Sequence, residues 1–127
     1  MRARVLAMAS LLLLAGGCSF SSQPLEPLVV GSQRFFTLEW QTAERGTQRV
    51  VQGSIRNDWG FAASNVRLLV EAVGPQDQLI NQRLITIGGE ITPGSRVSFE
   101  SPVPNAPGYR VRVFSYDWSQ AGEMFGR

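Results

Sequence analysis

The sequence predicts an all-β fold, an antiparallel β-sandwich of about seven strands. Three observations lead to this fold class. Apolar and polar residues alternate with a period of two in successive stretches, the pattern of strands with one buried face. Turn-forming residues separate these stretches at intervals of about eight to fifteen residues. No segment combines a helical period with capping residues, and a small closed barrel is the alternative architecture.

The strands are expected in stretches that are rich in β-branched and aromatic residues. In the first stretch, Phe36, Leu38 and Trp40 fall on one face. The apolar run 28–30 is a further candidate, as an edge strand of the domain. The six main stretches are 34–41, 48–56, 65–73, 79–87, 96–100 and 109–118. The residues expected to be largely buried are Trp40, Ile55, Leu68, Val70, Phe99, Val111 and Val113.

Glycine, proline, asparagine and aspartate mark the turns between these strands. The sequence 74–77 places Pro75 where a type I turn requires a fixed φ. Residues 66–72 also fit one face of a helix, but their flanks and β-branched residues favour a strand. The other expected turns are 43–46, 57–60, 88–94 and 102–108.

The first eighteen residues have the features of a secretory signal. Arg2 and Arg4 give a basic start, and the apolar run 5–15 is too short to span a bilayer. Three small residues, beginning with Ala15, precede Cys18, the only cysteine. This arrangement resembles the lipobox of bacterial lipoproteins, although Ala15 stands where leucine is more usual. The resemblance implies that the signal is removed and that Cys18 carries a lipid, such as palmitate, on its thiol.

The chain is expected to consist of one domain with a lipid-anchored tether. Serine and proline in the first half of the tether favour an extended, weakly ordered chain. By resemblance to lipoproteins of bacteria with two membranes, a residue other than aspartate after the cysteine, here Ser19, favours the outer membrane and its periplasmic face. The four parts are the signal peptide 1–17, the tether 18–32, the β-sandwich domain 33–118 and the C-terminal tail 119–127.

Composition and charge argue against several classes of function. The arginines of the signal leave ten basic and ten acidic residues, so the mature chain is near neutral and nucleic acid is not expected as a partner. There is no histidine, and the single cysteine is assigned to the lipid, so common catalytic bases and transition-metal ligands are missing. We therefore expect neither an enzyme nor a cofactor.

One combination of residues, Asn57 and Asp58 in a turn with Asp117 near the end of the last strand, has ligands suited to calcium. Asparagine and aspartate in a turn after a strand more often bond their own backbone. We therefore expect no metal site.

A longer resemblance covers residues 48–118. This region is similar to the small immunoglobulin-like domains of bacterial envelope lipoproteins, including the FxLYD-type family, and the resemblance implies an immunoglobulin- or fibronectin-like sandwich. After the third strand the chain has Ala72-Val73-Gly74 in place of the Tyr-Asp pair of the family name. The segments that carry the resemblance are 51–57, 63–70, 91–94, 97–99, 103–104 and 109–111.

The last strand supplies the candidate binding residues. If Val111 and Val113 point inward, the alternate residues form an outward row of two arginines and three aromatics, a composition suited to recognition of a protein or a glycan. A bulge near Ser115 would instead return an aromatic to the core. Trp59 and Phe61 pose the same question in the loop before the third strand. The row consists of Arg110, Arg112, Phe114, Tyr116 and Trp118.

Together these observations predict an envelope lipoprotein that acts as a non-catalytic protein-interaction or accessory module. The partners expected are the membrane, through the N-terminal lipid, and an envelope protein. The alternative is a lipoprotein that binds glycan or peptidoglycan.

Overall fold

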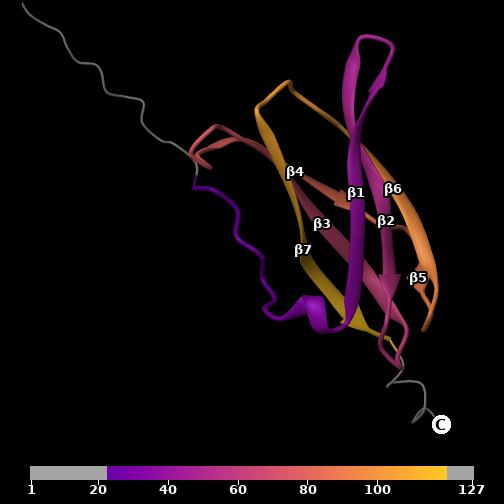
Figure 1. Ribbon diagram of the computed structural model, residues 1–127. Coiled ribbons are helices and arrows are strands. Elements are labelled where there is room, and N and C mark those ends of the chain that lie inside the picture. The colour runs from indigo at the N-terminus through magenta and orange to yellow at the C-terminus, as the bar shows by residue number, and fades with distance from the viewer. Residues whose placement is uncertain (1–22, 120–127) are drawn as a thin grey trace, which may run out of the picture.

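Two antiparallel sheets lie face to face in the computed structural model, which describes residues 23–119 (Figure 1). Sheet A has the strand order β1-β2-β6. In sheet B, β3 is central, with β7 along one edge and with β4 and the short β5 along the other. A 3-10 turn, η1 (Ser32–Arg34), precedes the first strand. The strands are β1 (Phe36–Arg45), β2 (Gln48–Asn57), β3 (Ala63–Val73), β4 (Leu79–Thr86), β5 (Glu90–Ile91), β6 (Arg96–Val103) and β7 (Gly108–Trp118).

The prediction of an antiparallel β-sandwich is confirmed, and the architecture is consistent with an immunoglobulin-like domain. Within the described residues, the strands pair only inside their own sheet, so the molecule is an open sandwich and not a closed barrel. Each of the six predicted strands is present, and residues 66–72 lie in β3 and not in a helix. The short strand β5, which has only two residues, was not predicted from the sequence.

The core lies between the two sheets and is built from alternate residues of their strands. From β3, for example, Val66, Leu68 and Val70 point into it. Burying these branched side chains supplies the main stabilisation of a domain of this size. Six of the seven residues predicted to be buried are so: Ile55, Leu68, Val70, Phe99, Val111 and Val113.

Trp40 is the exception, and its predicted burial was wrong. Its side chain is 37% exposed. β1 is an edge strand, and the β1–β2 hairpin extends beyond the area that sheet B covers (Figure 1). The burial of β1 accordingly falls from Phe36, at its start, to the exposed residues that follow Leu38. Alternation in the sequence gave the face of Trp40 but not the extent of the opposing sheet.

The turns follow the expected chemistry. The amide of Asp77 donates to the carbonyl of Gly74 at 3.0 Å, which closes the turn that contains Pro75. Between β1 and β2, the predicted turn 43–46 is displaced by two residues, because Arg45 already pairs with Gln48. The two-residue connection is then Gly46-Thr47, and Gly46 has the left-handed φ of +65° that such a tight hairpin requires.

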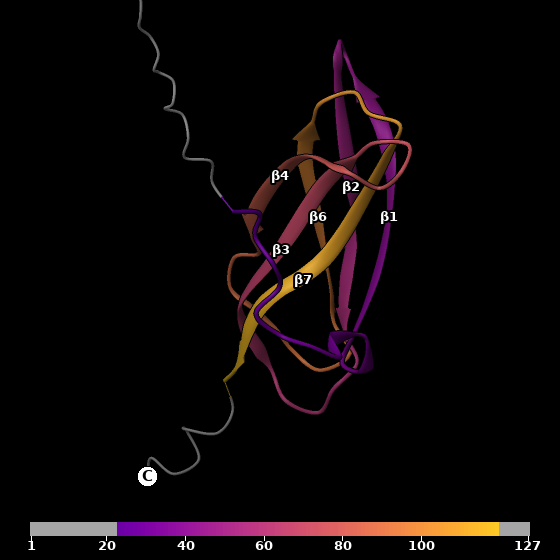
Figure 2. The ribbon, with the colours of Figure 1, turned by 90° about the vertical axis from the view of Figure 1, so that its left-hand side faces the viewer.

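Residues 23–31 cross the outer face of sheet B before the chain enters η1 and β1 (Figure 2). The amide of Leu28 donates to the carbonyl of Phe114 at 2.8 Å, and Val29 is partly buried against the core. These residues do not form the edge strand expected at 28–30. The later part of the predicted tether is therefore docked on the domain. Cys18, the signal segment and residues 120–127 lie outside the described residues.

Candidate functional site

The five residues predicted to form one outward row on the last strand lie in different environments, so the prediction of a single exposed row was wrong. Two of them, the arginines, stand on the outer face of sheet B and contact Glu71. Phe114 is only 5% exposed. The remaining two aromatics pack against the core. The five residues are Arg110, Arg112, Phe114, Tyr116 and Trp118.

A β-bulge in β7 causes this division. Leu68 of β3 pairs with Val113, whereas the preceding Arg67 pairs with Ser115, so Phe114 is an extra residue without a partner in the register. Past the bulge the alternation is inverted. The guanidinium of Arg67 bonds the Ser115 hydroxyl at 2.9 Å and lies over the Phe114 ring. The bulge anticipated near Ser115 is therefore present, and it turns the last two aromatics inward.

Six aromatic rings gather where β7 ends, and we call them the aromatic cluster. Trp118 is at its centre, with ring centroids 5.0 Å from Tyr116 and 5.7 Å from the stacked ring of Phe36. Phe35 makes an edge contact with Trp118 at 5.5 Å. Offset and edge-to-face pairs of this kind stabilise by about 0.5–1.5 kcal/mol beyond the area buried. The members are Phe35, Phe36, Trp59, Phe61, Tyr116 and Trp118.

Two rings of the aromatic cluster, Trp59 and Phe61, remain 44% exposed. Trp59 contacts Phe35 edge-on at 4.7 Å, so its position is set by packing even though half of its surface faces solvent. An ordered aromatic side chain with this exposure offers a large apolar contact area at little conformational-entropy cost. Trp59 and Phe61 therefore give this end of the sandwich an exposed apolar surface that is backed by packed rings.

Asn57 holds the loop that presents these two rings. It is fully buried, and its side-chain oxygen accepts the Trp59 amide at 2.8 Å. Its side-chain nitrogen donates to the carbonyls of Phe61 and Ile91, both at 2.8 Å. All of these bonds are internal to the fold, so Asn57 pins the loop to β5.

Asn57, Asp58 and Asp117, the three possible calcium ligands named from the sequence, each bond other groups of the protein. Asp58 pairs with Arg56, and Asp117 accepts a bond from Asn65. Hydrogen bonds from Thr37 and Arg56 lower the pKa of Asp58. Over residues 23–119, no three histidine, cysteine, aspartate or glutamate side chains are grouped so as to hold a metal ion.

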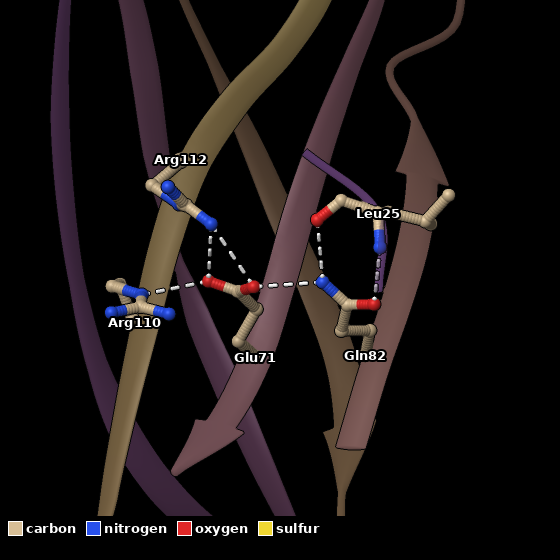
Figure 3. A network of polar contacts seen from close by, with 5 residues as sticks. All are labelled: Leu25, Glu71, Gln82, Arg110 and Arg112. Carbon is tan, nitrogen blue, oxygen red and sulfur yellow. Dashed lines mark hydrogen bonds and ion pairs between the residues drawn. The ribbon is translucent and has the colours of Figure 1, made fainter. Parts of the chain in front are cut away.

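At the other end of the β3–β7 pair, Glu71 is a buried carboxylate on the outer face of sheet B (Figure 3). Its side chain is 1% exposed. Arg110 and Arg112 reach it from β7, with nitrogen–oxygen distances of 2.7 Å and 3.1 Å. Gln82 of β4 donates to it from the opposite side at 2.9 Å. A buried carboxylate stays ionised only where ion pairs and hydrogen bonds replace the water that it loses on burial.

These partners decide the charge state of Glu71. Desolvation is the largest single influence and by itself raises the pKa of Glu71. The hydrogen bonds from Arg110, Gln82 and Arg112 together outweigh it, and the pKa of Glu71 falls below its ordinary value of 4.5. The same bond raises the pKa of Arg110. The group is therefore an ion pair at neutral pH, and its charges are used within the fold.

Gln82 also holds the N-terminal segment. Its side-chain oxygen accepts the Leu25 amide at 2.8 Å, and its side-chain nitrogen donates to the Leu25 carbonyl at 2.9 Å (Figure 3). One amide side chain thus bonds both backbone groups of Leu25 as well as Glu71. No pattern in the sequence indicates this arrangement, because Leu25 and Gln82 are 57 residues apart in the chain.

A second surface is an open hollow of about 680 Å³ on sheet A. The guanidinium of Arg45 lies along it and bonds Glu100 at 2.9 Å and Gln52 at 2.6 Å. Polar side chains at an open hollow are compatible with hydroxyl-rich ligands. The outward-facing residues that line it include Glu39, Gln41, Gln52, Ser54, Ser98 and Glu100.

Comparison of the chain with models of known protein families and with characterised proteins finds no match. In the part of the chain that the structure describes, no helix has the length and apolar character needed to cross a membrane.

Proposed function

We propose that this protein is a lipid-anchored envelope lipoprotein that acts as a non-catalytic protein-interaction module, with the aromatic cluster as its partner-binding surface. The observation that carries the proposal is the half exposure of Trp59 and Phe61 above four further packed rings. Binding energy at protein interfaces is concentrated in a few such aromatic anchors. The rings already pack against one another in the free domain, so less side-chain ordering is needed on association.

The anchoring part of the proposal comes from the sequence. The basic, apolar and small-residue segments before Cys18 support removal of the signal and lipidation of this cysteine. Ser19 supports the outer membrane, with the domain on the periplasmic side. The resemblance of residues 48–118 to immunoglobulin-like envelope lipoproteins, including the FxLYD-type family, supports the same assignment. Mass spectrometry of the membrane-extracted protein tests it: an unmodified N-terminal peptide would contradict lipidation.

Capture of partners by chemical cross-linking in intact cells tests the binding surface. We expect one recurring protein partner, lost in the double variant Trp59→Ser and Phe61→Ser. The matched control is Leu79→Ser and Ile80→Ser on β4, which removes two apolar side chains of similar exposure, 37% and 50%, away from the aromatic cluster. Capture by the first variant at the level of the control would contradict the proposal.

The second candidate function, binding of glycan or peptidoglycan, is favoured by the polar hollow on sheet A. Retention of the protein on isolated cell wall would support it. The retention should then be lost when Ser98→Trp fills the hollow, and it should persist in the Trp59→Ser and Phe61→Ser variant. These two outcomes separate the hollow from the aromatic cluster.

A further inference from the structure

The N-terminal segment determines from which end of the sandwich the chain leaves toward Cys18. β1 begins at the aromatic cluster, because Phe35, directly before it, lies 4.7 Å from Trp59 and 5.5 Å from Trp118. A chain that left the domain at Phe35 would thus be attached at the end that carries the exposed rings. The segment instead turns back across sheet B (Figure 2).

The contacts of this segment lead away from the aromatic cluster in steps. Leu28 is bonded to the carbonyl of Phe114, at the bulge, and Leu25 is bonded to Gln82. Gln82 pairs with Glu71 across the β3–β4 ladder. Glu71 is eight residues along β3 from Ala63, the partner of Trp118, which corresponds to about 26 Å. The segment therefore carries the point of attachment from one end of the domain toward the other.

Specific hydrogen bonds hold Leu25 on the domain. Both backbone polar groups of Leu25 are bonded by Gln82, whose amide is oriented by its bond to the buried Glu71 (Figure 3). Farther along the segment, the Leu28 amide bonds the Phe114 carbonyl and Val29 is partly buried against the core, whereas the side chain of Leu28 is 69% exposed. The docked segment is therefore held mainly by backbone bonds, with apolar burial at Val29. We call the contact between Gln82 and Leu25 the latch.

We propose that the latch reverses the end of the domain from which the lipid anchor extends, so that the aromatic cluster faces away from the bilayer and toward a partner in the aqueous space. This inference rests on the proposed function. Only residues 19–24 separate Cys18 from Leu25, a reach of about 25 Å at full extension. Without the latch and the Leu28 contact, the anchor would pull at Phe35, and the exposed rings would be at the membrane-facing end.

The first measurement tests the latch itself, by amide hydrogen exchange of the chain from Cys18 onward, which contains every described residue. We expect the Leu25 amide to be protected in the wild type and to exchange about tenfold faster in Gln82→Leu, which removes both bonds to Leu25. The control is Gln41→Leu, an exposed glutamine on sheet A. An unprotected Leu25 amide in the wild type, or equal exchange in the two variants, would overturn the proposal.

The second measurement tests orientation. The chain is coupled through its only cysteine, Cys18, to a maleimide lipid in phosphatidylcholine vesicles that also contain a dansyl-headgroup lipid. All proteins in this measurement also carry Trp40→Phe, which leaves Trp59 and Trp118 as the only tryptophans. Energy transfer from tryptophan to dansyl then reports how close these two side chains come to the bilayer. We expect low transfer in the protein without further changes and in Gln41→Leu. We expect higher transfer in Gln82→Leu combined with Leu28→Pro, because proline lacks the amide that bonds the Phe114 carbonyl.

Equal transfer in all three proteins, with fast amide exchange over residues 23–31 in the variant that combines Gln82→Leu and Leu28→Pro, would overturn the proposal. Because the lipid is attached chemically, this result does not depend on whether the cell lipidates Cys18. Failure of lipidation in the cell would contradict the anchoring part of the proposed function and leave the measured geometry intact. Partner capture in cells tests the aromatic cluster, and energy transfer tests the orientation of the domain. A failure of the proposed function is therefore distinguishable from a failure of this inference.

Discussion

The two ends of the β3–β7 pair are held by different forces. Where Ala63 pairs with Trp118, six aromatic rings pack together and leave two of their members half exposed. Where Glu71 pairs with Arg110, a buried carboxylate is enclosed by two arginines and a glutamine. The first end depends on apolar burial, which is insensitive to pH, and it carries the surface that we propose binds a partner. The second end depends on ionised groups and uses its polar atoms to hold the chain's own N-terminal segment.

The surface that we propose for partner binding and the contact that we propose for positioning the domain thus lie at opposite ends of one pair of strands. The two arginines were predicted from the sequence to be binding residues, but in the structure both pair with Glu71. The exposed rings of the aromatic cluster, Trp59 and Phe61, are supplied by the loop between β2 and β3. Variants at either end should therefore differ both in what they destabilise and in how the effect depends on pH.

The largest expected effect comes from removing the positive charges around Glu71. Arg110→Met together with Arg112→Met keeps the apolar stems over the carboxylate but leaves it without a cation, and we expect a loss of about 3 kcal/mol in the free energy of unfolding. Urea denaturation followed by circular dichroism measures it. Adding Glu71→Leu to the double variant should restore most of the lost free energy of unfolding, because no unpaired carboxylate then remains buried. Unchanged stability in the double variant would show that the ion pair is not a structural element.

At the opposite end, Trp118→Ala should cost about 2–3 kcal/mol, somewhat less than for a fully buried tryptophan, because it removes the ring that contacts the five others. Thermal unfolding in the same buffer gives the comparison. The matched control is Trp40→Ala, an exposed tryptophan that is not part of the aromatic cluster. Equal losses in the two variants would mean that ring packing around Trp118 adds nothing beyond surface area.

A smaller effect distinguishes the ends by pH. Because the pKa of folded Glu71 lies below its ordinary value of 4.5, this group contributes stability that is present above that pH and is lost as the pH falls through the folded pKa. The wild type should therefore lose more stability than Glu71→Gln between about pH 5 and pH 3. Urea midpoints across this range measure the difference. Parallel curves for the two proteins would contradict the assigned charge state.

The smallest effect on stability is expected from Trp59→Ser with Phe61→Ser. The loop is held by Asn57 and both rings are half exposed, but three ring contacts are lost, so the free energy of unfolding should fall by about 1–2 kcal/mol. Thermal unfolding run beside the capture experiment separates binding from folding. A much larger loss would assign these rings to the fold and not to a partner.

Much of the architecture could be predicted from local patterns, because strand alternation and turn residues act over short distances along the chain. Leu68 and Val70 were placed in the core on this basis, and Pro75 was placed in its turn. The exposure of Trp40 could not be predicted in this way, because exposure on an edge strand depends on where the opposing sheet ends. The bulge at Phe114 could be named as an alternative but not located, because it is defined by the register with β3.

The sequence by itself determined the fold class, most of the core and the candidate signal and lipidation site, because these depend on composition and on spacing within one segment. Only the tertiary structure decided the surfaces. It inverted the alternation after Phe114, gathered Trp59 and Trp118 from different parts of the chain, and brought Glu71, Gln82 and Leu25 together. Such contacts join residues that are distant in the sequence, and their formation depends on how whole strands pair and pack.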